Sequence, residues 1–424
     1  MAKKSVLVNN SDMDGLKKNV LRTLIDLIEE KPPLGISYEK RLRDLIDEAF
    51  FDQKVTLENE DKSRFLEEIY KYATTFKMID PMLADPEVSE IMINGPDNVY
   101  KEALGKILST DVKFDNDMQV MFLINHIINP LGRYISYKIP MVDAHLPDGS
   151  RVNAVVPPII KQGPVISIRK FIKKIMNLDE LLELGAINEN MAEFLKICVR
   201  ARLNILVGGN TSAGKTTLLN ILAGSIPENE RIITLEDSLE LQLPQPHILS
   251  LEARPADNNG EGMVSMRDLV RNVLRMRPDR IIVGEVRGSW ALDMLQAMNT
   301  GHDGSMTTVH SNSARDTLSR LETMVMTAGL DIPIVAIRRQ MASALDLIVY
   351  LTRFPDGTRK VTQITEVVGM ETDVISLTDL FLFQQTDIND KGQPIGTFRS
   401  TGLRPMFDKK VKDVGLLIPP RLLH

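Results

Sequence analysis

A glycine-rich loop between an apolar run and a helix-forming run carries residue types suited to phosphate chemistry. Gly209, Gly214, Lys215 and Thr216 fit the pattern G-x-x-x-x-G-K-[ST]. Glycines let the backbone fold around a phosphate with its N–H groups pointing inward, and the following helix adds its N-terminal dipole. Lys215 would then reach the β- and γ-phosphates, and the Thr216 hydroxyl would ligate Mg²⁺. The loop therefore predicts binding of a nucleoside triphosphate with Mg²⁺.

A glycine turn without any ligand is the alternative interpretation of this loop. The context disfavours it, because the apolar run 203–207 predicts a buried strand before the loop, and a good helix former follows. A strand before and a helix after are the surroundings in which this pattern binds phosphate.

Acidic side chains follow two other predicted strands. The strand predicted over 231–235 ends at Glu236 and Asp237, and the strand predicted over 280–283 ends at Gly284 and Glu285. Ligands of parallel sheets bind beyond the carboxyl ends of the strands. A glutamate there can ligate Mg²⁺ through water or orient the attacking water. Glu285 could also be an ordinary exposed strand-end carboxylate, but the phosphate-binding loop favours the functional interpretation.

Two histidines are weaker candidates for the same site. His310 ends the strand predicted over 307–309. A lone histidine is more often structural, but its strand-end position makes a contact with the γ-phosphate an equal hypothesis. His302 lies in a glycine-flanked loop and has less support.

Composition limits the other classes of function. Hydrophobic residues make up 43% and charged residues 25% of the 424 residues, which is typical of a globular protein. The net charge of −6 gives no overall basic character for non-specific nucleic-acid binding, and we expect no nucleic-acid partner. The lone Cys198 excludes an intrachain disulfide. Without an apolar run of membrane length or a signal-peptide core, we expect a cytoplasmic protein that reaches a membrane only through a partner.

The order of predicted elements divides the chain into four parts. Helical periodicity over residues 1–76 predicts a small helical N-terminal domain, with a docking role as the best functional hypothesis for it. Turn-rich short strands and one helix over 77–172 predict an α/β N-terminal domain with its own sheet. A linker over 173–187 leads to residues 188–424, where strands and helices alternate as a parallel sheet requires.

Four separate motifs in this order resemble the secretion ATPase superfamily of type II and type IV systems. They are GGNTSAGKTTLLN, ITLEDSLELQL, LRMRPDRIIVGEVRG and ALDMLQAMNTGHDGSMTTVHSNSARDTLSRLETM. Within the superfamily, PMVDAHLPDGSRVNAVVPP, ISIRKF, QPHILSLEARP and ITEVVGM are similar to the CpaF (TadA) type, which drives assembly of the Tad/Flp type of type IV pilus. The resemblance runs from about Lys77 to Phe383. It implies that residues 188–424 form a RecA-like P-loop NTPase domain.

The resemblance also implies roles for individual residues. The Walker A loop would comprise nine residues that contact the nucleotide: Gly209, Asn210, Thr211, Ser212, Ala213, Gly214, Lys215, Thr216 and Thr217. Glu236, Asp237 and Glu240 fall in the aspartate-box segment, with Glu236 joining Thr216 and Glu285 as a predicted metal ligand. Glu285 would be the Walker B glutamate and His310 part of the histidine box. Arg151 and Arg169, both in the N-terminal α/β domain, would be the γ-phosphate arginines.

At the level of the assembly, the resemblance implies a homo-hexamer that hydrolyses ATP with Mg²⁺. It would sit at the cytoplasmic face of the inner membrane and act on pilus platform proteins there. A type IV secretion or conjugation ATPase is the nearest alternative. A DNA-translocating motor would share the core but should carry a basic, aromatic-bearing channel. A nucleotide switch without hydrolysis could have lost Glu285, which is present.

Overall fold

A computed structural model describes residues 10–103, 105–171, 177–256, 260–329, 331–389 and 393–423. Contacts between Cα atoms divide the chain into two compact units. The first holds Met1–Ile172, and the second holds Lys173–Ala256 with Gly260–His424. Part of the predicted linker 173–187 lies outside the described residues.

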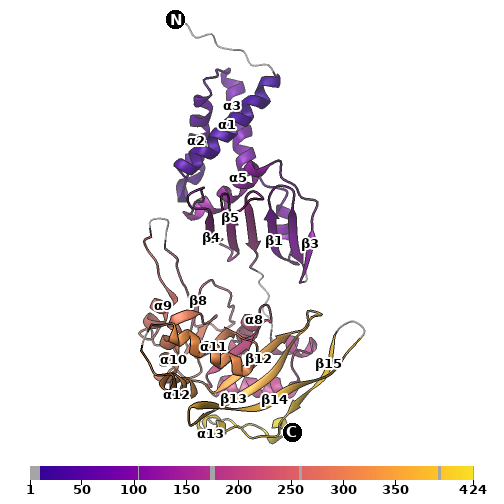
Figure 1. The fold of residues 1–424 in the computed structure, drawn as a ribbon, viewed down its shortest axis with the longest axis vertical. Coiled ribbons are helices and arrows are strands. Elements are labelled where there is room, and N and C mark those ends of the chain that lie inside the picture. The colour runs from indigo at the N-terminus through magenta and orange to yellow at the C-terminus, as the bar shows by residue number, and fades with distance from the viewer. Residues whose placement is uncertain are drawn as a thin grey trace. The chain divides into compact units, whose positions relative to one another are not determined.

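The first unit combines a group of helices with one antiparallel sheet (Figure 1). Its helices are α1 (Asn10–Glu30), α2 (Tyr38–Asp52), α3 (Asn59–Thr74), α4 (Asp80–Ala84) and α5 (Asp117–Ile128). Its strands are β1 (Val88–Asn94), β2 (Val99–Ala103), β3 (Lys106–Ser109), β4 (Met141–His145), β5 (Arg151–Val155) and β6 (Val165–Arg169). They form a six-stranded sheet in the order β3-β2-β1-β6-β5-β4.

One hydrophobic core serves the helices and the sheet of this unit. It runs from Leu16 of α1 through Phe65 of α3 and Phe122 of α5 to Ile168 of β6. The alternation of buried and exposed residues along β4, β5 and β6 places one face of the sheet against this core. The predicted boundary near residue 76 stays a prediction, and the shared core means that α1–α3 cover apolar side chains of the part that follows.

The second unit is built on a nine-stranded sheet in the order β15-β14-β13-β12-β7-β11-β10-β8-β9. Six neighbouring strands, from β12 to β9, are parallel. They are β7 (Ile205–Gly209), β8 (Ile232–Glu236), β9 (Ile248–Glu252), β10 (Arg280–Val283), β11 (Met306–His310) and β12 (Leu347–Arg353). The strands β13 (Arg359–Glu371), β14 (Val374–Ile388) and β15 (Pro394–Ser400) add an antiparallel extension.

Helices cover both faces of the parallel part of this sheet (Figure 1). Along β7, Ile205 and Val207 join one core, whereas Leu206 joins the other. The first core takes α6 (Leu178–Glu183), α7 (Glu189–Arg200), α8 (Lys215–Ala223) and α13 (Asp408–Asp413). The second takes α9 (Met266–Val273), α10 (Ala291–Asn299), α11 (Ala314–Met326) and α12 (Ile334–Ala344). This three-layer arrangement confirms the predicted α/β class.

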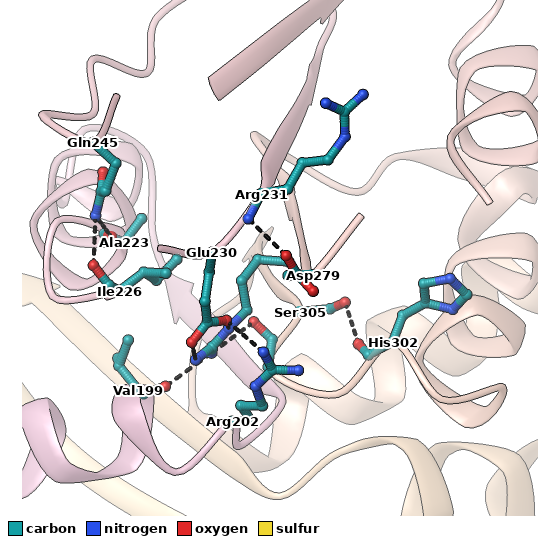
Figure 2. A network of polar contacts seen from close by, with 12 residues as sticks. Val199, Arg202, Ala223, Ile226, Glu230, Arg231, Gln245, Asp279, His302 and Ser305 are labelled. Atoms are coloured by element: carbon teal, nitrogen blue, oxygen red, sulfur yellow. Dashed lines mark hydrogen bonds and ion pairs between the residues drawn. The ribbon is translucent and has the colours of Figure 1, made fainter. Parts of the chain in front are cut away.

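A buried ion pair fixes the edge of the sheet at which the parallel strands begin (Figure 2). The fully buried Arg280, the first residue of β10, donates from Nε to Glu230 Oε2 (2.6 Å) and from Nη1 to the Val199 carbonyl (2.8 Å). Arg202 binds the same carboxylate from the surface. A side chain at Gly304 would clash with the Arg280 guanidinium. The cluster joins α7 to the loops before β8 and β11, at the end of the sheet opposite the glycine-rich loop.

Candidate active site

The glycine-rich loop connects β7, which ends at Gly209, to α8, which begins at Lys215. A Cβ atom at Gly209 would lie 2.7 Å from the Leu351 carbonyl oxygen, so the neighbouring strand leaves no room for a side chain there. Gly214 has φ +94°, a backbone conformation that glycine adopts readily. The non-glycine residue Ser212 also has a positive φ of 58°. The loop therefore has the strand–turn–helix context that the motif predicts.

Strand register brings the other predicted site residues to the same edge of the sheet. Val309 and His310 of β11 pair with Gly208 and Gly209 of β7. On the other side of β11, Val283 of β10 pairs with Thr307, and Glu285 follows two residues later. Glu236 ends β8, the next strand outward. The order along this edge is therefore Gly209, His310, Glu285 and Glu236.

A chain of polar contacts links Lys215 to Glu285 through His310. Lys215 Nζ lies 3.1 Å from His310 Nδ1 and donates to the Asn210 carbonyl (3.2 Å). His310 Nε2 lies 3.1 Å from Glu285 Oε1, and Arg287 Nη2 donates to Glu285 Oε2 (2.6 Å). Both oxygens of Glu285 are thus held in place. A histidine protonated at Nε2 alone satisfies both of its contacts, since it accepts from Lys215 and donates to Glu285.

The surroundings of His310 favour its neutral form by lowering its pKa below the ordinary value. Burial lowers the pKa of His310, and the positive charges of Lys215, Arg287 and Arg320 oppose the effect of Glu285, which raises it. Burial also lowers the pKa of Lys215, partly offset by Glu285. In contrast, hydrogen bonding to Glu285 raises the pKa of Arg287. The predicted contact between His310 and a γ-phosphate stays a prediction, and His310 lies where it would also orient Lys215 and Glu285.

Glu236 is almost completely buried and holds the later part of the aspartate-box segment, at Glu240 and Leu241. Its Oε2 accepts hydrogen bonds from the backbone N–H groups of Glu240 (2.7 Å) and Leu241 (2.9 Å). A Cβ atom at Gly284 would lie 3.2 Å from Glu236 Cγ. The Glu236 side chain of the neighbouring strand therefore packs closely against Gly284, the residue before Glu285.

The residues at this edge fit a magnesium–nucleotide complex. Glu236 Oε1 and the neighbouring Thr234 hydroxyl are buried and have no hydrogen-bond partner within the described parts of the chain. No group of three or more metal-binding side chains occurs among the described residues. Magnesium at nucleotide sites usually has one or two protein ligands, with phosphates and water completing its shell. Thr216, Glu236 and Glu285 stay the predicted ligands on this basis.

A polar hollow of about 350 Å³ opens beside the loop. Its lining includes Asn210 and Thr211 of the loop, His310, and Arg320 of α11. Asn210 Oδ1 is buried without a hydrogen-bond partner in the described structure. Lys215 does not line the hollow, but its Nζ contacts two residues that do, Asn210 and His310. The other predicted contacts, including those of Ala213 and Thr217, stay predictions.

Arg151 and Arg169 belong to the first unit, and each is described there only. Arg151 of β5 pairs directly with Arg169 of β6, and Arg169 pairs on its other side with Glu90 of β1. His145 pairs with Arg151 on the outer side. Glu90 thus places an opposite charge beside this pair of arginines. The role of both arginines at the γ-phosphate stays a prediction.

Two functional candidates were not predicted from the sequence. Arg287 lies only two residues after Glu285, and its role depends on the side-chain contact that the structure reveals. Arg359 of β13 donates from Nε to the Ser212 carbonyl (2.9 Å), although 147 residues separate the two. The segment Arg353-Phe354-Pro355-Asp356-Gly357 signals a hairpin turn and could have placed Arg359 near the end of β12. His302, the weaker histidine candidate, contacts the carbonyl of Ala297 in the last turn of α10.

The second unit has the features that define a P-loop NTPase. They are a phosphate-binding loop, a parallel sheet with helices on both faces, and a glutamate, Glu285, just after the end of the nearby strand β10. The family described as "Type II/IV secretion system protein" matches residues 73–378. The chain belongs to this family of secretion and pilus ATPases.

Individual relatives agree with this assignment. A Mycobacterium tuberculosis protein named for conjugal transfer is 35% identical over 307 residues, which cover 71% of this chain and 87% of that protein. The type IV secretion system protein VirB11 of Bartonella quintana is 32% identical over 330 residues, covering 69% and 91%. The ATPase DotB of Yersinia pseudotuberculosis has a similar fold, with a TM-score of 0.50 and 19% identity over 71% of this chain and 81% of that one. None of the helices in the described residues is long and apolar enough to span a membrane.

Proposed function

We propose that this chain hydrolyses ATP with Mg²⁺ and that the energy drives a membrane-associated transport or pilus machine. The observation that carries the proposal is the contact chain Lys215–His310–Glu285 at the ends of adjacent parallel strands, directly beside the phosphate-binding loop. This arrangement provides a cation for the phosphates and a carboxylate for the attacking water within one site.

Each residue has a distinct task in this reaction. The loop amides and Lys215 bind the phosphates, and Mg²⁺ bound with the nucleotide would offset the charge of the phosphoryl oxygens. Glu285 orients a water molecule and accepts its proton as the bond to the γ-phosphorus forms and the bond to the leaving ADP oxygen breaks. Arg287 and His310 hold the two Glu285 oxygens, so that the carboxylate keeps one orientation during the reaction.

At the level of the assembly, we propose a homo-hexamer at the cytoplasmic face of the inner membrane. In this proposal Arg151 and Arg169 close over the γ-phosphate of the same chain, and the contact is lost after hydrolysis. The partner would be a Tad/Flp-type pilus platform. The segments PMVDAHLPDGSRVNAVVPP, ISIRKF, QPHILSLEARP and ITEVVGM support this subtype.

A conjugation or type IV secretion ATPase is a second candidate, and a specific observation favours it. The relatives include a mycobacterial protein named for conjugal transfer and the type IV secretion protein VirB11, at 35% and 32% identity. Both candidates share the ATPase site and differ in the platform that the motor serves.

A genetic experiment separates the two candidates. The gene is replaced in its host by a Lys215→Ala allele, and surface pili and conjugal transfer are both measured. Loss of pili with normal transfer supports the pilus motor, whereas loss of transfer with normal pili supports the conjugation ATPase. The purified wild-type chain should hydrolyse ATP in either case, and the Lys215→Ala chain should not.

A further inference from the structure

The β12–β13 hairpin lies directly against the phosphate-binding loop. Leu351 near the end of β12 pairs with Gly209 of β7, so β12 runs alongside the start of the loop. The chain then turns over 354–358 and returns as β13, beginning at Arg359. A Cβ atom at Gly214 would lie 3.3 Å from Arg359 Cδ. Arg359 therefore lies against the last part of the loop, at Ser212 and Gly214.

One backbone contact ties Arg359 to a strained point of the loop. Its Nε donates to the carbonyl oxygen of Ser212 (2.9 Å). Ser212 has φ 58°, in the left-handed region that is unfavourable for a non-glycine residue. A hydrogen bond from a charged donor is strong enough to offset this backbone strain. The contact thus acts at the loop's non-glycine residue with a positive φ.

Hydrogen bonds and packing hold the hairpin that carries Arg359 in one conformation. Asp356 Oδ1 accepts hydrogen bonds from the backbone N–H and the hydroxyl of Thr358, which fixes the turn. The next residue, Lys360, donates to the Gly185 carbonyl (2.8 Å) and lies over the rings of Phe383 and Phe398. A guanidinium on a rigid element can hold a loop better than one on a mobile segment.

From this geometry we propose that Arg359 is a positioning residue for nucleotide binding. It holds Ser212 in the left-handed conformation, and this keeps the loop open to phosphate with its N–H groups directed inward. The inference rests on the ATP binding proposed above. Arg359 acts through the Ser212 backbone, so its loss changes the affinity for ATP and the KM more than the kcat.

The test measures binding of mant-ATP, a fluorescent ATP analogue, with Mg²⁺ and steady-state ATP hydrolysis by the full chain. Arg359→Ala should weaken mant-ATP binding roughly 10- to 100-fold and raise the KM by a similar factor. Arg359→Lys, which keeps a charged donor, should recover part of this affinity. Arg353→Ala is the matched control, since Arg353 pairs with Arg359 across the hairpin and carries the same charge. It has no recorded contact with the loop in the described structure, and it should bind like the wild type.

A double-mutant comparison tests the route of the effect. Glycine adopts a positive φ without strain, so in a Ser212→Gly background the Arg359→Ala change should weaken binding only about threefold or less. An equal loss in both backgrounds would contradict the proposal, because Arg359 would then act on the nucleotide directly. Equal losses in Arg353→Ala and Arg359→Ala would contradict it as well, since charge alone would explain them.

The wild type and Lys215→Ala separate this inference from the proposed function. Failure of the wild type to bind mant-ATP would refute both. A different result would refute only the role of Arg359: the wild type binds mant-ATP, Lys215→Ala does not, and Arg359→Ala binds it like the wild type.

Discussion

Burial raises the pKa of the Glu236 carboxyl to about 7, from an ordinary value of 4.5. Its hydrogen bonds from the Glu240 and Leu241 N–H groups act in the opposite direction and reduce the rise. The folded state therefore binds a proton at Glu236 more tightly than the unfolded state does. The resulting contribution to stability is fully present below pH 4.5 and is lost as the pH rises through about 7.

This sign gives a pH-dependent prediction for Glu236→Gln. The amide keeps an oxygen that can accept both backbone hydrogen bonds, but it cannot ionise. Above neutral pH, the pH-dependent loss of stability that the wild type suffers and the variant avoids should reach on the order of 3 kcal/mol in the free energy of unfolding. We expect the melting temperature of the variant to rise relative to that of the wild type between about pH 5 and about pH 9. Melting profiles that stay parallel over this range would show that Glu236 does not change protonation there.

The sequence alone predicted the residues of the site that follow strand ends. Glu285, His310 and Glu236 were found because an apolar run that ends in a polar residue indicates the carboxyl edge of a parallel sheet. Arg287 and Arg359 were missed for different reasons. The first is one of several charged residues in a loop, and the second depends on the register between β7, β12 and β13, which no local pattern encodes.

At the scale of elements, periodicity predicted type better than extent. The strand before the phosphate-binding loop was predicted over 203–207 and runs over Ile205–Gly209. The two glycines at its end extend it, because Gly208 pairs with Val309 and Tyr350, and Gly209 pairs with His310 and Leu351. Helix α10 was not predicted, since its run of nine residues is short and is followed directly by the glycine-containing segment 300–304. The buried Arg280 was read only as the start of a strand, although it carries the ion pair that joins several elements.

The Arg280 cluster gives a stability prediction at this scale. Glu230→Gln leaves the buried guanidinium without its counter-charge, and breaking such a pair costs about 3–5 kcal/mol. Arg202→Ala is the control, because Arg202 binds the same carboxylate from a position with 40% side-chain exposure, where a pair contributes about 0–1 kcal/mol. Thermal unfolding should therefore show a large drop for Glu230→Gln and a small one for Arg202→Ala. Similar small drops in both variants would mean that the cluster does not stabilise the sheet.

At the scale of the whole molecule, the open question is which chain supplies the arginines to each nucleotide. Arg151 and Arg169 form a like-charged pair on the sheet of the first unit, and Lys215 lies in the second. An arginine that contacts the γ-phosphate contributes about 10³–10⁵ in rate. We propose that each chain completes its own site.

Mixed assemblies test this proposal. Lys215→Ala chains and Arg169→Ala chains are co-assembled, and ATP hydrolysis is measured. Sites completed within one chain leave no intact site in the mixture, so turnover should stay near background. Measurable turnover in the mixture alone would show that a neighbouring chain supplies the arginine. Inhibition of wild-type assemblies by added Lys215→Ala chains is the control that mixing occurs.

In the proposed reaction, Glu285 acts on the attacking water in the assembled chain, and a comparison of two glutamate variants tests this role. Steady-state ATP hydrolysis and mant-ATP binding are measured for the wild type and Glu285→Gln, with Glu252→Gln at the end of β9 as a strand-end control. Glu285→Gln should bind mant-ATP with Mg²⁺ like the wild type and turn over at least about 10²-fold more slowly, because a positioned base contributes about 10²–10⁴ in rate. Glu252→Gln should leave turnover unchanged. Near-normal turnover by Glu285→Gln would contradict the account.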